Sequence, residues 1–158
     1  MKKKLKSFII SIIIPLSVGI ISALLTRGNM NIYEEIITPP LSPPSFLFPV
    51  VWSVLYILMG ISAAMIYTDS IASERQKDRA LYTYAASLVV NFFWSIIFFN
   101  MRAFLFSFLW LLLLLYLIIS TILQYRKINQ TAAYLQIPYA VWVTFAGYLN
   151  LTIWILNR

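Results

Sequence analysis

The sequence predicts an all-α integral membrane protein, a single domain built as a bundle of five transmembrane helices. Hydrophobic residues make up 61% of the 158 residues and charged residues only 11%. A soluble domain is typically nearer half apolar and a quarter charged. The charged residues lie between five long apolar stretches. Because a charge at the centre of a bilayer is costly, this distribution is typical of membrane spans.

Each apolar stretch holds about 20 residues or more, which is enough to cross a hydrocarbon core of about 30 Å as a helix. Strands are excluded because the stretches are continuously apolar and an open sheet cannot satisfy its backbone in lipid. The predicted spans are residues 5–25, 46–67, 80–99, 104–124 and 132–156.

The first span follows four lysines and resembles a signal peptide in that respect. We interpret it as a span because it is long for the apolar region of a signal peptide and no clear A-x-A cleavage site follows. It contains Pro15 and the pair Gly19 and Ala23, and the second span contains Gly60 and Ala64. Such small-xxx-small pairs let helices approach closely, either within one subunit or between subunits.

Residues 26–45 form the only long loop on the outer side. The loop carries Tyr33 and two proline pairs, at 39–40 and 43–44, which stiffen the chain and delay the next helix. A rigid loop above a helical bundle is either a lid or a plain connector, and the residues alone leave both open.

Three spans carry faces at helical spacing that combine a large aromatic side chain with a small or polar one. They are Trp52, Tyr56 and Gly60 in the second span, Asn91, Trp94 and Phe98 in the third, and Trp142, Ala146 and Asn150 in the fifth. Such faces serve helix packing or line a flat apolar slot with polar anchors, as in ligand sites. The two amides should face the interior, where each either bonds another helix or contacts a ligand.

The fourth span, with Leu111–Leu115, has no such face and would lie against lipid. No span has an acid or a base near its middle, which disfavours proton-coupled transport and general acid–base catalysis. The chain has no cysteine or histidine. This excludes disulfides, thiolate nucleophiles, ordinary zinc sites, Ser-His-Asp catalysis and the commonest haem ligand, and no metal site is predicted.

The net charge of +7 does not indicate nucleic-acid binding, because the basic residues are scattered between apolar runs. They suit the anionic headgroups of membrane lipids better. With the N-terminus in the cytoplasm, nine basic residues lie inside and only Arg27, Arg102 and Arg158 lie outside. The positive-inside rule therefore predicts a cytoplasmic N-terminus and an outer C-terminus.

Three motifs, in order, resemble those of the translocator protein / tryptophan-rich sensory protein family. The first element is a proline-rich loop running into a helix, the second an N-x-x-W…F-F helix, and the third a P-Y-x-x-W-x-x-F-A-x-x-L-N helix. In this chain they read PPLSPPSFLFPVVWSVLYILMG at 39–60, NFFWSIIFF at 91–99 and PYAVWVTFAGYLNLTIW at 138–154. Together with five predicted helices, the resemblance covers essentially the whole chain.

The resemblance implies a five-helix bundle, commonly a homodimer, in a bacterial plasma membrane. It implies a pocket under the first loop for porphyrins and other apolar ligands, lined by Trp52, Asn91, Trp94, Trp142 and Ala146 with Tyr33 above. Tyr56 and Asn150 complete the ligand-binding residues that we expect. Bacterial members are thought to promote light-dependent oxidative breakdown of protoporphyrin IX, with residues matching Trp52 and Trp142 as the implicated pair.

The sequence departs from the family pattern in a few places. Val50 occupies the usual position of a proline, Thr38 that of a lysine, and the animal cholesterol motif of tyrosine and arginine is missing after Asn150. We therefore do not expect steroid binding. No cofactor beyond the ligand is implied, and a metal-free porphyrin held by stacking on tryptophan is favoured. Transmembrane transport of tetrapyrroles, and stress sensing through a partner protein, are the alternative functions.

Overall fold

The computed structural model describes residues 1–158 and consists of helices and loops without a strand. Five helices are long and apolar enough to cross a membrane, which confirms the predicted fold class. The long helices are α1 (Lys2–Thr26), α3 (Leu47–Tyr67), α4 (Glu74–Ser95), α5 (Phe104–Arg126) and α6 (Gln130–Leu156), and α2 (Ile32–Glu35) is a single short helix in the loop.

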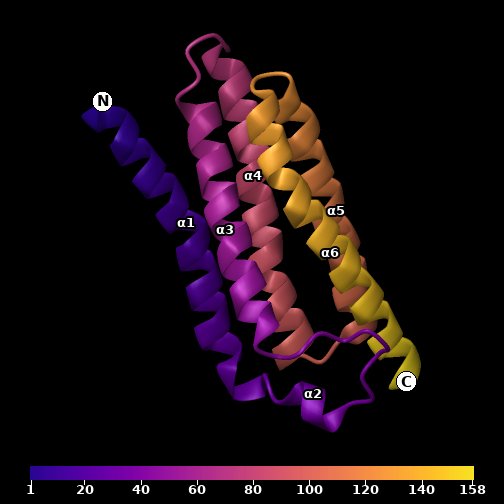
Figure 1. Cartoon of the computed structure of the whole chain (residues 1–158). Coiled ribbons are helices and arrows are strands. Elements are labelled where there is room, and N and C mark those ends of the chain that lie inside the picture. Colours follow the sequence, from indigo (N-terminus) through magenta and orange to yellow (C-terminus); the bar gives the residue numbers. More distant parts are fainter.

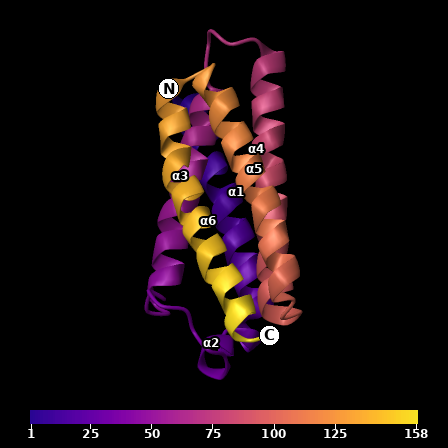
Figure 2. The ribbon, with the colours of Figure 1, turned by 90° about the vertical axis from the view of Figure 1, so that its right-hand side faces the viewer.

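A bundle is formed by α3, α4, α5 and α6, and α1 packs against one side of it, mainly against α3. Figure 1 shows α1 diverging from the bundle toward its N-terminus and approaching α3 toward its other end. The view in Figure 2 shows α5 and α6 side by side, with the loop that carries α2 crossing the end of the bundle where the C-terminus lies. The loop therefore covers one mouth of the bundle.

Helix α4 begins six residues before the predicted span, at Glu74. Its start is set by a capping box: Ser73 Oγ accepts from the Gln76 N–H at 3.3 Å, and Gln76 Oε1 accepts from the Ser73 N–H at 3.0 Å. Because the first turn of α4 is polar, hydropathy does not reveal it. At its other end α4 runs into a π-helical turn, Ile96–Asn100, a feature that often accompanies functional sites.

The glycine of each small-residue pair lies in the seam between α1 and α3, within the subunit. A Cβ on Gly60 would collide with the backbone of Ser11 and Ile12 of α1, and a Cβ on Gly19 would collide with the ring of Tyr56. The absence of these side chains lets the two helices touch. This contact fixes α1 against the bundle.

The loop between α1 and α3 is fastened to the end of α6. The Ile37 N–H donates to Asn157 Oδ1 at 2.8 Å, and Asn157 Nδ2 donates back to the Ile37 carbonyl at 3.0 Å. Close by, the Tyr148 hydroxyl donates to the Pro40 carbonyl at 2.9 Å. Three hydrogen bonds thus hold the loop backbone over α6, two of them just before the first proline pair and one at its second proline.

The same loop is also fastened to the turn between α4 and α5. Asn29 Nδ2 donates to Asn100 Oδ1 at 2.8 Å, and Arg102 pairs with Glu35 at 2.8 Å. Both contacts are exposed, so each contributes little to the free energy of folding on its own. Their effect is to set where the loop lies.

Candidate functional site

A cavity of about 500 Å³ lies at the loop end of the bundle. It falls within the size range of small-molecule sites. Helices α1, α3, α4 and α6 and the loop supply its walls, whereas α5 supplies none. Its lining residues are Leu16, Gly19, Ile20, Ser22, Ala23, Thr26, Met30, Tyr33, Ser45, Phe48, Pro49, Trp52, Ser53, Tyr56, Asn91, Trp94, Ser95, Phe99, Trp142 and Ala146.

Three of the five tryptophans line this cavity, one each from α3, α4 and α6. Trp52 stacks on Tyr56 with ring centroids 5.5 Å apart and meets the edge of Tyr139 at 6.1 Å. Trp142 meets Phe48 edge to face at 5.9 Å. These contacts hold the rings in fixed orientations, so the walls present flat aromatic surfaces.

Two polar side chains sit among these rings. Asn91 is only 2% exposed, and its Nδ2 donates to the Tyr139 hydroxyl at 3.0 Å. The indole N–H of Trp142 is buried and has no hydrogen-bond partner within the protein. A buried indole N–H usually has a partner. Trp142 Nε1 is therefore a buried donor that no group of the protein satisfies.

Asn150 lies outside the cavity lining and has another role. Its Oδ1 accepts from Trp94 Nε1 at 3.1 Å and from Ser107 Oγ at 3.0 Å, and its Nδ2 donates to the Phe104 carbonyl at 2.8 Å. Asn150 thus joins α6 to α4 and α5 and fixes the ring of Trp94. The sequence left open whether Asn150 bonds another helix or contacts a ligand, and in the structure its amide bonds to two other helices.

Tyr33 of α2 closes the cavity from the loop side. Its ring stacks on Phe48 with centroids 5.7 Å apart and an interplanar angle of 19°, and it meets the edge of Phe99 at 6.2 Å. Tyr33 thus contacts, from the loop, two aromatic rings that line the cavity. Its position over the cavity agrees with a lid more than with a plain connector.

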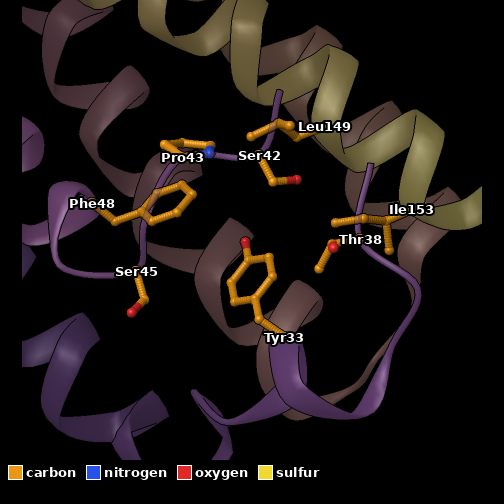
Figure 3. A pocket seen from close by; sticks show the side chains of 8 residues that line it. All are labelled: Tyr33, Thr38, Ser42, Pro43, Ser45, Phe48, Leu149 and Ile153. Carbon is orange, nitrogen blue, oxygen red and sulfur yellow. The ribbon is translucent and has the colours of Figure 1, made fainter. Parts of the chain in front are cut away.

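A second, smaller cavity of about 220 Å³ lies between the loop and the end of α6. It is lined by Tyr33, Thr38, Ser42, Pro43, Ser45, Phe48, Leu149 and Ile153 (Figure 3). Tyr33, Ser45 and Phe48 also line the larger cavity. The two cavities are therefore neighbours that share one wall.

The structure brings seven of the eight expected ligand-binding residues to the larger cavity, all except Asn150. The sequence analysis missed the contribution of α1, whose Gly19, Ala23 and Thr26 line the cavity at helical spacing. This stripe of small and polar residues was the signal in the sequence for a cavity wall on α1. The sequence analysis interpreted its Gly19 and Ala23 only as a helix-packing pair. The sequence analysis also placed Phe98 on the face of the third span, whereas Phe99 of the π-helical turn is the residue that lines the cavity.

No aspartate, glutamate, lysine or arginine lines the larger cavity. No group of acidic, cysteine or histidine side chains in the chain is arranged to hold a metal ion. The cavity can therefore stack on a flat apolar molecule and hydrogen-bond to it. Its lining holds hydroxyl, amide and indole groups but no carboxylate, ammonium or guanidinium group.

Comparison with known proteins shows what the whole chain is similar to. The model of the TspO/MBR family matches residues 11–155. The chain is 32% identical over 158 residues to the tryptophan-rich protein TspO of Chlorobaculum tepidum, covering 99% of each chain. It is 36% identical over 126 residues to protein CrtK of Rhodobacter capsulatus, covering 79% of this chain and 78% of that one. It is 30% identical over 141 residues to the translocator protein of Bos taurus, covering 89% and 83%.

Proposed function

The chain belongs to the TspO/MBR family of multi-pass membrane proteins, and from this premise we propose that its larger cavity binds metal-free tetrapyrroles. The observation that carries the proposal is a space of about 500 Å³ walled by Trp52, Trp94 and Trp142. Their rings offer flat surfaces for stacking on a conjugated macrocycle.

The residue types of the chain favour a metal-free pigment. With no histidine or cysteine in the chain, the two side chains that commonly ligate haem iron are missing. The binding mode proposed here is therefore stacking on the aromatic rings, which phenylalanine in place of tryptophan can still provide.

We also propose that light and dioxygen drive oxidative breakdown of the bound pigment, with Trp52 and Trp142 as the participating side chains. Both rings line the cavity and would lie next to the macrocycle. Indole is an oxidisable neighbour for an excited porphyrin. The competing proposals are passive transport of the pigment and stress sensing through a partner protein.

The test is titration of the purified protein with protoporphyrin IX, followed by absorbance under light and in the dark. Wild type should bind saturably and bleach the pigment in light faster than a protein-free detergent control. The double variant Trp52→Phe/Trp142→Phe should keep binding and lose the bleaching. Trp154→Phe is the matched control, because Trp154 lies outside the cavity against Arg158.

Each outcome separates the proposals. Unchanged bleaching in the double variant would remove the two tryptophans from the reaction. Saturable binding without any protein-dependent bleaching would favour the carrier or the sensor. Absence of saturable binding to wild type would overturn tetrapyrrole binding itself.

Three further properties complete the proposal. We propose a bacterial plasma membrane location with the N-terminus in the cytoplasm, as the lysines at 2–4 and 6 favour. This orientation puts both cavities on the outer side. We also propose a homodimer whose contacts lie outside the α1–α3 seam, since Gly19 and Gly60 are already used within the subunit.

A further inference from the structure

The smaller cavity differs in chemistry from the larger one, because half of its eight lining residues carry a hydroxyl group. Figure 3 shows the hydroxyls of Tyr33, Thr38 and Ser42 turned toward one space between the loop and α6, whereas the Ser45 hydroxyl points away from it. The remaining walls include Phe48, Leu149 and Ile153. The space is small, polar on the loop side and apolar on the helix side.

The hydroxyls of this cavity are held in place by a fixed backbone. The residue before Thr38 exchanges two hydrogen bonds with Asn157, and the Pro40 carbonyl accepts from Tyr148. Ser42 Oγ donates to the Pro39 carbonyl at 2.7 Å, which engages its proton. Tyr33 and Thr38 are therefore the hydroxyl donors left for a guest.

The two cavities are separated by little more than one pair of rings. Tyr33 and Phe48 line both and stack on each other at 5.7 Å. A molecule in the larger cavity would thus need only a short side chain to pass this pair and reach the hydroxyls. The Tyr33 hydroxyl, seen in Figure 3 pointing into the smaller cavity, lies on that path.

We propose that the smaller cavity is a subsite that receives a carboxylate side chain of a tetrapyrrole whose ring occupies the larger cavity. The inference rests on the proposed function and names the ligand class more narrowly, as macrocycles that bear carboxylates. Hydroxyl donors suit a carboxylate because hydrogen bonds to an ionised acceptor are shorter and stronger than neutral ones. No lysine or arginine lines the smaller cavity, so hydroxyl groups would have to donate the hydrogen bonds to the carboxylate.

The test compares two macrocycles: protoporphyrin IX, which bears two propionates, and etioporphyrin, which bears none. Tyr33→Phe keeps the ring that stacks on Phe48 and removes only the hydroxyl, and Thr38→Val is nearly isosteric. Each variant should weaken binding of protoporphyrin IX by about tenfold, the usual scale for a hydrogen bond to a charged group. Neither should change the affinity for etioporphyrin by more than about twofold.

Thr144→Val is the matched control, since Thr144 lines neither cavity and its hydroxyl bonds only to the Ala140 carbonyl of its own helix. It should leave both affinities unchanged. Equal weakening of both pigments by Tyr33→Phe, or unchanged binding of protoporphyrin IX in both variants, would overturn the subsite. If wild type bound neither pigment saturably, the proposed function would fail, and the subsite with it.

Discussion

Trp94 Nε1 donates a hydrogen bond to Asn150 Oδ1 across 3.1 Å, joining the cavity wall on α4 to helix α6. Asn150 is 1% exposed, and its other bonds go to Ser107 and to the Phe104 carbonyl of α5. One amide therefore links three helices and orients one of the three cavity tryptophans. The cavity depends on a residue that does not line it.

Replacement of Asn150 by leucine should disturb both the fold and the cavity. It leaves the indole N–H of Trp94 without an acceptor, and an unpaired buried polar group costs about 1–3 kcal/mol. We expect a lower unfolding temperature in detergent and weaker porphyrin binding, because the ring of Trp94 is free to turn. The measurements are thermal unfolding by circular dichroism and pigment titration.

Thr152→Val is the control for this prediction, since the Thr152 hydroxyl bonds only to the Tyr148 carbonyl of its own helix. It should change neither quantity. If Asn150→Leu weakened binding but left the unfolding temperature at the wild-type value, Asn150 would contact the ligand directly, and the structural role assigned to it would be wrong.

Gly60→Leu should disrupt the fold rather than the oligomer. The new side chain would collide with the α1 backbone at Ser11 and Ile12, and overpacking of this kind costs about 1–3 kcal/mol or more. We expect less folded protein and a lower unfolding temperature. A folded, monomeric Gly60→Leu protein in size-exclusion chromatography with light scattering would instead show that this face joins two subunits.

Asn157→Ala should loosen the loop above the cavities. Asn157 holds Ile37 through two hydrogen bonds, and it is only half-buried at the very end of α6, so the bundle itself should stay folded. If the loop is a lid, pigment should dissociate several-fold faster from the variant in stopped-flow measurements, while the unfolding temperature changes little. An unchanged dissociation rate would identify the loop as a plain connector.

The topology can be tested with single cysteines, because the natural chain has none. Gly28 has open space around its Cβ position, and Arg75 is exposed in the first turn of α4, at the other end of the bundle. In intact cells, a membrane-impermeant maleimide should label Gly28→Cys and spare Arg75→Cys. Permeabilised cells should label both, and the reverse pattern in intact cells would invert the proposed orientation.

The fold was predictable because lipid imposes strict rules on sequence. Charges between apolar stretches locate the helices, and every predicted span overlaps one of the long helices with ends that differ by at most six residues. Aromatic residues at helical spacing also pointed to the faces of α3, α4 and α6 from which tryptophans line the larger cavity. The three tryptophans of the cavity follow from that pattern.

The details that escaped prediction depend on helix rotation and register. Each step of four residues turns about 40° beyond a full turn, so Asn150 lies about 80° around α6 from Trp142 and faces other helices. The π-helical turn shifts the register between Trp94 and Phe99, and no sequence pattern marked it. Helix α1 can line the cavity because it packs closely on α3 at Gly60. The spacing of residues within one helix does not reveal which other helix it contacts.

The most direct test of the tetrapyrrole site is to fill the larger cavity from one side. Ala146 lines it from α6, and Thr144 lies on the exposed face of the same helix. Protoporphyrin IX titrations of Ala146→Leu and Thr144→Leu, both checked for folding by circular dichroism, give the comparison. Ala146→Leu should weaken binding at least tenfold while Thr144→Leu binds as wild type, whereas equal affinities in both folded variants would contradict binding in this cavity.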